Sequence, residues 1–208
     1  MRRDLVLHLI MTLEGGFLGT YAVVSHAGIF ASAQTGNLMS MAISLTGRDL
    51  ADFWVRLGAF GVFSASIALF HILEICERFP LKKWCIYIDM AALLLTICVP
   101  EGLDPVLSLY PIFFASCFQW GAYSSVKGYG CSSLFITNNL KQSVLGWTDY
   151  LFRHDRKSLE QAVLYTAVLC MFFVGGMIGC FSAHLWGNAG GIVGFLFLVI
   201  AQMILWIG

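Results

Sequence analysis

The sequence predicts an all-α integral membrane protein built from two homologous repeats. Of its 208 residues, 59% are hydrophobic and 12% are charged, and the mean hydropathy is +0.80. A chain of this composition cannot cover itself with a water-compatible surface, so its expected surroundings are lipid. A polar motif, Thr-Gly-Asn-Leu at 35–38, also recurs 102 positions later as Thr-Asn-Asn-Leu at 137–140. These two observations predict a duplicated membrane protein.

The duplication extends on both sides of the motif. Between positions 19 and 46, eight of 28 residues are identical to those 102 positions later, where chance would give roughly two. The identical pairs are Gly19/Gly121, Tyr21/Tyr123, Val24/Val126, Gly28/Gly130, Thr35/Thr137, Asn37/Asn139, Leu38/Leu140 and Thr46/Thr148. The length leaves no room for a separate soluble domain, so we expect one membrane domain, 1–208, with internal repeats 1–100 and 101–208.

Six apolar stretches are candidates for membrane-spanning helices. They cover residues 5–24, 57–75, 84–99, 106–126, 162–185 and 192–207. Each is near the roughly 20 residues that a 30 Å hydrocarbon core requires of a helix. The first is interrupted by Glu14 and is followed by no small-x-small cleavage site, so it is expected to be a retained span rather than a signal peptide.

Two further segments, 28–45 and 130–147, carry the polar motif in their middle, and each either spans the bilayer or dips in and returns. Short basic loops stay in the cytoplasm. Six spans with two re-entrant segments and a cytoplasmic amino terminus place nine basic residues inside and two outside. Eight spans, four per repeat, place only seven basic residues inside and four outside. The nine are Arg2, Arg3, Arg78, Lys82, Lys83, Lys127, Arg153, Arg156 and Lys157, against Arg48 and Arg56.

The charge bias therefore favours a multi-pass protein of the cytoplasmic (inner) membrane with three spans and one re-entrant or broken helix in each repeat. Because three is an odd number, the second repeat enters the membrane from the opposite side, and the repeats are inverted. The two motifs then approach the midplane from opposite faces and build a central polar site.

The predicted solute site consists of the two polar motifs and the helical faces that follow them. Each Thr is expected to cap its helix and to leave first-turn N–H groups open to a cavity, where they suit an anion or a carbonyl oxygen. The alternative is that these polar groups only make hydrogen bonds between helices. The predicted site residues are Thr35, Gly36, Asn37, Ser40, Thr137, Asn138, Asn139 and Gln142.

Glu14 and Asp89 lie inside apolar stretches, away from their ends. Glu14 lies near mid-bilayer in the first span, where a charge costs roughly 3 kcal/mol, and is a candidate for proton coupling or cation binding. The alternative is a structural carboxyl bonded to a neighbouring helix. Asp89 follows Lys83 by six residues and is expected to reach the cytoplasmic interface or to pair with a lysine.

Several classes of function are excluded. A net charge of zero argues against nucleic acid as a partner. The sequence contains no phosphate-binding glycine loop, nucleophile elbow or His-Glu-x-x-His motif, so neither enzyme activity nor a cofactor is expected. Seven cysteines without a Cys-x-x-Cys predict no metal site. The expected partners are the lipid bilayer and an unidentified small solute, and glycine-rich helix faces are candidates for contact with a second copy.

The sequence also resembles a family of bacterial multi-span membrane proteins. The runs Gly-Phe-Leu-Gly-Thr at 16–20 and Ala-Gln-Thr-Gly-Asn at 33–37 resemble the signature of the YoaK-like family, a domain of unknown function. Gln119-Trp120-Gly121 falls where the family tends to show Gln-Asn-Ala. Gly19 stands where the family usually has Asp, and Trp120 where it usually has Asn. Glu14 lies about a turn from Gly19. The resemblance implies the architecture and no particular solute.

We therefore expect a small secondary transporter of an unidentified small solute. Internal duplication with broken apolar segments at matching places is typical of secondary transporters. Two alternatives stay open: a passive channel or facilitator lined by the polar helix faces, and a membrane subunit or scaffold that transports nothing.

Overall fold

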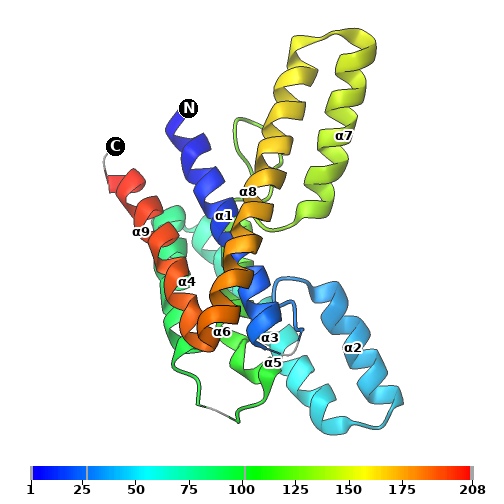
Figure 1. The fold of residues 1–208 in the computed structure, drawn as a ribbon, viewed down its shortest axis with the longest axis vertical. Helices are drawn as coiled ribbons and strands as arrows, with labels where there is room; N and C mark the ends of the chain where they lie inside the picture. The colour runs from blue at the N-terminus through cyan, green and yellow to red at the C-terminus, as the bar shows by residue number, and fades with distance from the viewer. Residues whose placement is uncertain (1, 27, 101, 207–208) are drawn as a thin grey trace.

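The computed structural model describes residues 2–26, 28–100 and 102–206. Over these residues the regular elements are helical, apart from one isolated bridge between Val126 and Tyr129, which confirms the predicted all-α class. The helices are α1 (Arg2–Ser25), α2 (Gln34–Thr46), α3 (Leu50–Ile75), α4 (Leu81–Ile97), α5 (Pro105–Ser108), α6 (Tyr110–Ala122), α7 (Ile136–Arg153), α8 (Arg156–Trp186), the 3₁₀ helix η1 (Gly187–Gly191) and α9 (Ile192–Trp206) (Figure 1).

Three stretches of helix are long and apolar enough to cross a membrane. They are α1, α3 and the continuous stretch Arg156–Trp206 that α8, η1 and α9 form together. At 1.5 Å per residue, the 24 residues of α1 and the 26 residues of α3 each exceed the roughly 30 Å of a hydrocarbon core.

The fourth apolar stretch, 106–126, forms a shorter helix than its length suggests. The chain makes the short helix α5, breaks at Leu109 and begins again as α6. Pro111 lies in the first turn of α6, where its missing N–H costs nothing, whereas continuing a helix through it would lose a hydrogen bond. The last predicted stretch ends in α9 at Trp206, and residue 207 lies outside the described residues.

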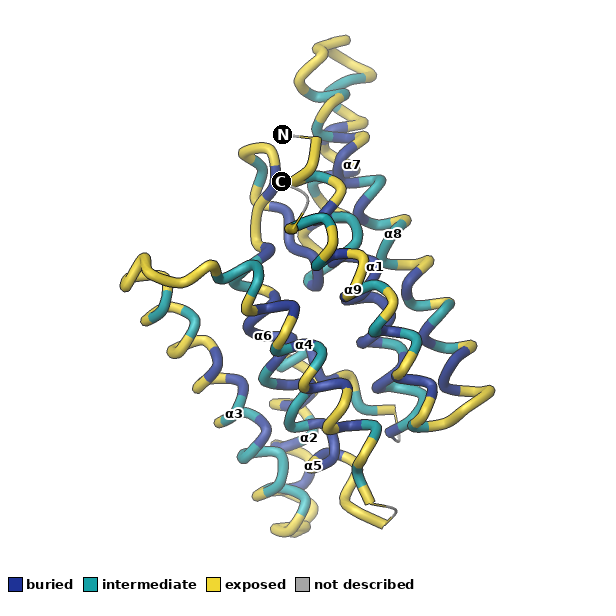
Figure 2. Tube along the Cα trace, turned by 90° about the vertical axis from the view of Figure 1, so that its left-hand side faces the viewer, coloured by how far each residue is buried: buried dark blue, intermediate teal, exposed yellow. Residues whose placement is uncertain are grey.

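Helix α1 lies at the centre and packs along α8 (Figure 1). Their backbones touch at glycines. A Cβ atom on Gly16 would lie 2.0 Å from the carbonyl oxygen of Phe172, and one on Gly175 would lie 1.8 Å from that of Leu13. Gly179 meets the carbonyl oxygen of Phe17 in the same way, at 2.4 Å. Small residues four positions apart allow this close approach between membrane helices. In Figure 2, α1 is buried over much of its length.

Two helical hairpins extend from this centre. Helix α2 packs on α3, and α7 packs on α8. Both α2 and α7 begin near the middle of the molecule and run toward opposite ends of it, whereas α1, α3, α4, α8 and α9 run roughly along the long axis (Figure 1). The predicted breaks before the two polar motifs are therefore present. Insertion in a bilayer and the repeat relationship stay predictions.

The predicted caps of α2 and α7 are wrong. The N-cap residues are Ala33 and Phe135, and neither side chain caps its helix. Their backbones are still extended, at φ −103°, ψ 91° and φ −89°, ψ 92°, so each helix begins with the next residue. Thr35 and Thr137 consequently lie inside the first turn.

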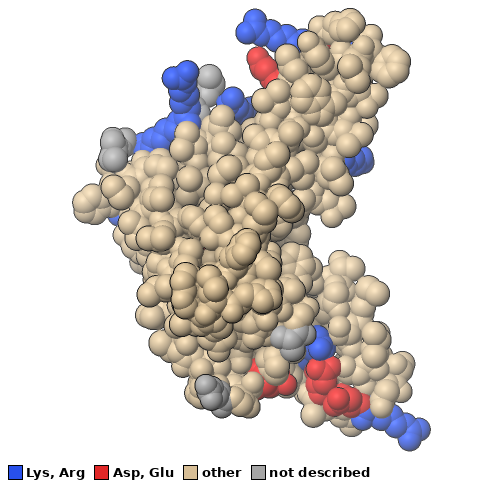
Figure 3. All heavy atoms as spheres, viewed as in Figure 1, with Lys and Arg blue, Asp and Glu red and all other residues tan. Residues whose placement is uncertain are grey.

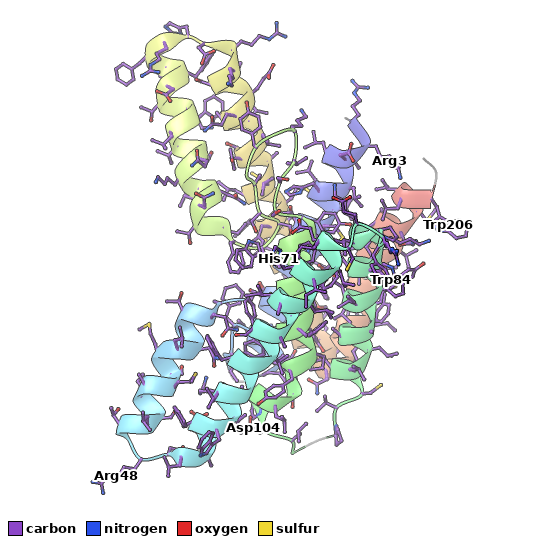
Figure 4. The ribbon with its side chains drawn as sticks, turned by 180° about the vertical axis from the view of Figure 1, so that it is seen from behind. Arg3, Arg48, His71, Trp84, Asp104 and Trp206 are labelled. Carbon is purple, nitrogen blue, oxygen red and sulfur yellow. The ribbon has the colours of Figure 1, made fainter. Side chains whose placement is uncertain are left out.

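Charged residues lie mainly toward the two ends of the molecule. The middle of the face in Figure 3 is almost free of them. Arg3 lies toward one end, and Arg48 and Asp104 lie toward the other (Figure 4). At the tip between α7 and α8, Asp155 accepts hydrogen bonds from the Ser158 hydroxyl and the Lys157 N–H, which lower the pKa of its carboxyl below the usual 3.8. This distribution suits a molecule with a lipid-facing middle.

Candidate functional site

A cluster of polar side chains is buried where α1, α4 and α6 meet. Glu14 comes from α1, Asp89 from α4 and Gln119 from α6, and all three are fully buried. The carboxyl groups of Glu14 and Asp89 are close enough for each charge to act on the other, and Gln119 lies beside Glu14. In the sequence, these residues interrupt three different apolar stretches, and their proximity arises only from the packing of the helices.

The hydrogen bonds of this cluster are incomplete. Gln119 donates its Nε2 to the carbonyl oxygen of Met11 at 2.7 Å, and Cys85 donates its thiol to Asp89 Oδ2 at 3.4 Å. Both carboxyl oxygens of Glu14, Oδ1 of Asp89 and Oε1 of Gln119 are shielded from solvent and have no partner among the described residues. Buried acceptors without partners cost free energy, so a proton, a cation or a bound water would stabilise this arrangement.

The expectation for Asp89 is wrong. Its side chain neither reaches the surface nor pairs with a lysine in the described part of the chain. Lys82 and Lys83 lie in the first turn of α4, and six residues of helix correspond to about 9 Å, which carries Asp89 into the protein interior. Helix α4 packs on α6 and α9, and the face on which Asp89 lies is buried among the neighbouring helices.

Polar groups continue from the cluster toward the end of the molecule at which α4 begins. His8 of α1 precedes Glu14 by six residues and is buried. Neither of its ring nitrogens has a hydrogen-bond partner in the regions described. Its ring centre lies 6.5 Å from that of Tyr123. The hydroxyl of Tyr123 donates to the carbonyl oxygen of Lys82 at 3.1 Å. His8 and Tyr123 thus lie between the first turn of α4 and the carboxyl pair.

The two motif asparagines take equivalent places on their helices. Asn37 of α2 is 6% exposed, and Asn139 of α7 is fully buried. Asn37 donates from Nδ2 to Oε1 of Gln34 and to the carbonyl oxygen of Arg56, both at 3.2 Å. Asn139 donates from Nδ2 to the carbonyl oxygen of Ser132 at 2.6 Å. In both, Oδ1 is buried and has no partner among the residues described.

The other predicted site residues lie around these asparagines in different settings. Thr35, Gly36, Thr137 and Asn138 are exposed, whereas Ser40 and Gln142 are half-buried. Gln142 accepts two hydrogen bonds from Gln161 of α8, each at 3.2 Å, which is the packing role of the alternative prediction.

Helix α1 contacts the loops before both motif helices. A Cβ on Gly15 would lie 3.0 Å from the carbonyl oxygen of Ser133, in the loop before α7. A Cβ on Gly19 would lie 2.8 Å from the ring of Phe30, in the loop before α2. These glycines therefore contact the loops before α2 and α7, here called the hinge loops, and Gly15 is the neighbour of Glu14 in the chain.

A cavity of about 270 Å³ lies at the start of α2. The loop before α2, the first turns of α2, Arg56 of α3 and Phe113 of α6 line it. Three of the predicted residues, Gly36, Asn37 and Ser40, belong to this lining. The sequence reading missed Arg56 and Phe113. Arg56 could have been noted as a basic residue that directly precedes the long apolar stretch 57–75.

Asp89 and Gln119 were also missed as members of a shared site. The available signal was chemical: Asp89 is the acid within the apolar stretch 84–99, and Gln119 is the amide within 106–126. Polar residues within membrane-type stretches are functional candidates by default. Periodicity alone does not reveal that they face the same helix.

Comparison with known proteins gives one match. No curated protein and no solved structure matches the chain. A family model described as "Protein of unknown function (DUF1275)" matches residues 7–205, nearly the whole sequence, and this family is the YoaK-like family that the motifs resemble. The chain therefore belongs to the DUF1275 family.

Proposed function

We propose that the protein is a small secondary transporter of the cytoplasmic membrane, in which Glu14 and Asp89 carry the coupling proton. The observation behind this proposal is the buried carboxyl pair. The carboxyl groups of Glu14 on α1 and Asp89 on α4 are both fully buried and near enough to interact electrostatically, and neither forms an ion pair within the described ranges.

Electrostatics makes such a pair a proton carrier. Two carboxylates in a water-free interior repel each other and lose their hydration, so the closed protein holds at least one proton between them. If a change of conformation lets water reach the pair, the free-energy cost of ionising the carboxyl groups falls and the proton leaves. A site that holds a proton when closed and releases it when open couples proton movement to conformational change.

The motif helices supply the moving parts in this proposal. Helices α2 and α7 begin near the middle of the molecule and run in opposite directions, as inverted repeats would. Gly15 and Gly19 of α1 contact the two hinge loops, which precede α7 and α2. A shift of either hinge loop therefore displaces α1, the helix that carries Glu14. The solute site proposed from the sequence thus adjoins the proton site through α1.

The test is proton flux that depends on a solute. Purified protein is reconstituted in liposomes that contain a trapped pH-sensitive dye and screened against a panel of small acids, amino acids, sugars and amines. We expect at least one solute to cause saturable proton movement. Glu14→Gln and Asp89→Asn, which remove the ionisable groups with little change in shape, should reduce this movement at least about tenfold.

The matched control is Asp149→Asn, which removes an exposed acid of α7 that pairs with Arg153, and which should transport like the wild type. Undiminished solute-dependent proton movement in the Glu14→Gln/Asp89→Asn double variant would contradict the proposal. Proton or solute movement that does not saturate would support the channel. The absence of proton movement with every solute of the panel would support the non-transporting subunit.

A further inference from the structure

We propose that the cavity at the start of α2 binds a small carboxylic acid that also carries a hydroxyl or amino group. This inference deepens the proposed function, because it names the chemical class of the solute. It starts from the 270 Å³ cavity between the hinge loop, α2, α3 and α6, which has room for a ligand of a few non-hydrogen atoms.

Arg56 supplies the positive charge of the site. Its side chain is 18% exposed and lines the cavity. Asp52 accepts from its Nε at 2.7 Å and also accepts a hydrogen bond from the hydroxyl of Ser44, which fixes the carboxylate on one edge of the guanidinium. The two terminal nitrogens of Arg56 have no hydrogen-bond partner in the part of the chain described. They form the fork that suits a carboxylate.

The first turn of α2 adds hydrogen-bond donors. Its N-cap is Ala33, whose side chain cannot accept a hydrogen bond from the first-turn amides. The cavity is lined by Ala33, Gly36, Asn37 and Ser40, so it follows the open end of the helix. Uncapped N–H groups and the partial positive charge of a helix start favour an anion. The guanidinium and the helix start thus act on the same space.

Asn37 indicates that the ligand also carries a donor. The amide is 94% buried, since 6% is exposed, and both N–H donors are used by Gln34 and by the carbonyl oxygen of Arg56. These two bonds fix the orientation of the amide and leave Oδ1 as an acceptor without a partner. An acceptor of this kind suits a hydroxyl or ammonium group. A hydroxy acid or an amino acid meets both requirements, whereas a simple carboxylate meets one.

The second hinge lacks this charge. The residue 102 positions after Arg56 is Ser158, which lies in the first turn of α8 and bonds Asp155. Asn139 therefore has the same unpartnered Oδ1 as Asn37 without a guanidinium at the equivalent position. The structure assigns the anion-binding role to the first hinge only.

Binding can be measured without transport. Protein in nanodiscs is titrated with lactate, glycine, acetate and acetamide, and binding is followed by saturation-transfer NMR of the ligand. We expect lactate or glycine to bind most tightly, acetate more weakly and acetamide least. Arg56→Gln should weaken binding of the best ligand about tenfold or more, because it removes a charged hydrogen-bond donor. Asp52→Asn should tighten it, because it removes the competing carboxylate.

Two further variants separate binding from folding. Gly36→Leu should abolish binding while the protein stays folded, since a Cβ at Gly36 meets nothing within 4 Å and the larger side chain fills the cavity. Arg153→Gln is the control for Arg56→Gln, because Arg153 pairs with Asp149 on α7 with the same four-residue spacing, away from the cavity. It should bind like the wild type.

The proposal is overturned if acetamide binds as well as lactate and glycine, if no member of the series binds, or if folded Arg56→Gln binds like the wild type. Glu14→Gln distinguishes this result from the proposed function. If only the carboxyl pair fails as a proton carrier, the acid still binds and Arg56 still matters. If only the cavity assignment fails, solute-dependent proton movement still requires Glu14.

Discussion

Asn37 and Asn139 use their amide groups to hold the backbone at the start of two helices. Asn37 holds the carbonyl of Arg56, in the helix that follows, whereas Asn139 holds the carbonyl of Ser132, in the loop that precedes it. The bond of Asn37 joins α2 to α3, as the alternative prediction of hydrogen bonds between helices has it, whereas the bond of Asn139 joins α7 to its own preceding loop. Their unpartnered oxygens are what the two residues can still offer to a ligand.

The hydrogen bond of Asn139 gives a direct prediction for stability. Asn139→Leu leaves the carbonyl of Ser132 without its donor in the interior and should lower the free energy of unfolding by about 1–3 kcal/mol. Asn138→Leu is the matched control, because the neighbouring side chain is exposed. Thermal unfolding in the same detergent compares the two variants. Equal melting temperatures would show that the Asn139 bond contributes nothing.

The chemistry of single residues was partly predictable. Glu14, Asn37 and Asn139 stand out in the sequence because polar groups are rare in lipid-soluble stretches and because the asparagines recur at a fixed offset. The place of Asp89 was not predictable from its distance to Lys83. Which face of α4 turns inward depends on how α4 packs on α6 and α9, and no local pattern records this.

The helices α1 and α8 form the closest contact between elements. Their approach depends on glycine on both sides, since Gly16 faces the backbone of α8 while Gly175 and Gly179 face the backbone of α1. Within α1 the neighbouring glycines divide the contacts: Gly15 and Gly19 contact the hinge loops, while Gly16 makes the contact with α8.

This contact predicts opposite effects for two identical substitutions. Gly175→Ala would place a methyl group 1.8 Å from the carbonyl oxygen of Leu13, so α1 and α8 must separate, at a cost of about 3 kcal/mol, the upper end of the usual range for overpacking. Gly61→Ala on α3 meets nothing within 4 Å and should be neutral or stabilising by up to about 1 kcal/mol.

Melting temperatures of the two variants measure this difference. Equal tolerance of both substitutions would mean that the glycine contact is not needed.

The beginnings of α2 and α7 were predictable at this level to within two residues, because polar motifs break the apolar pattern there. The break at Leu109 was missed although Pro111 signals it in the sequence, whereas the packing of Tyr110 against α3, where its hydroxyl donates to the carbonyl of Val55, is visible only in the structure.

The molecule as a whole has an apolar middle between two ends at which most of the charged residues lie. Arg3 lies toward one end and Arg48 lies at the other (Figure 4). The tip between α7 and α8 lies at the end that carries the amino terminus, and the tip between α2 and α3 lies at the opposite end (Figure 1). The sidedness that the positions of Lys and Arg predict is compatible with this arrangement and stays a prediction.

The arrangement predicts the sides on which the two tips emerge. Reporter fusions at Asp155 and at Gly47 should give opposite results, cytoplasmic for Asp155 and extracytoplasmic for Gly47. Fusions of an alkaline phosphatase and of a fluorescent protein that matures in the cytoplasm report the two sides. A cytoplasmic signal at both positions would instead support eight spans.

The central place of α1 has a consequence for biosynthesis. The ribosome makes this helix before its partners, since Asp89 and Gln119 come much later and the glycines of α8 that contact it come later still. Until α8 has been made, α1 lacks its main helix contact. The newborn helix must therefore be shielded by the insertion machinery, and nascent chains that stop before α8 should be recognised and degraded.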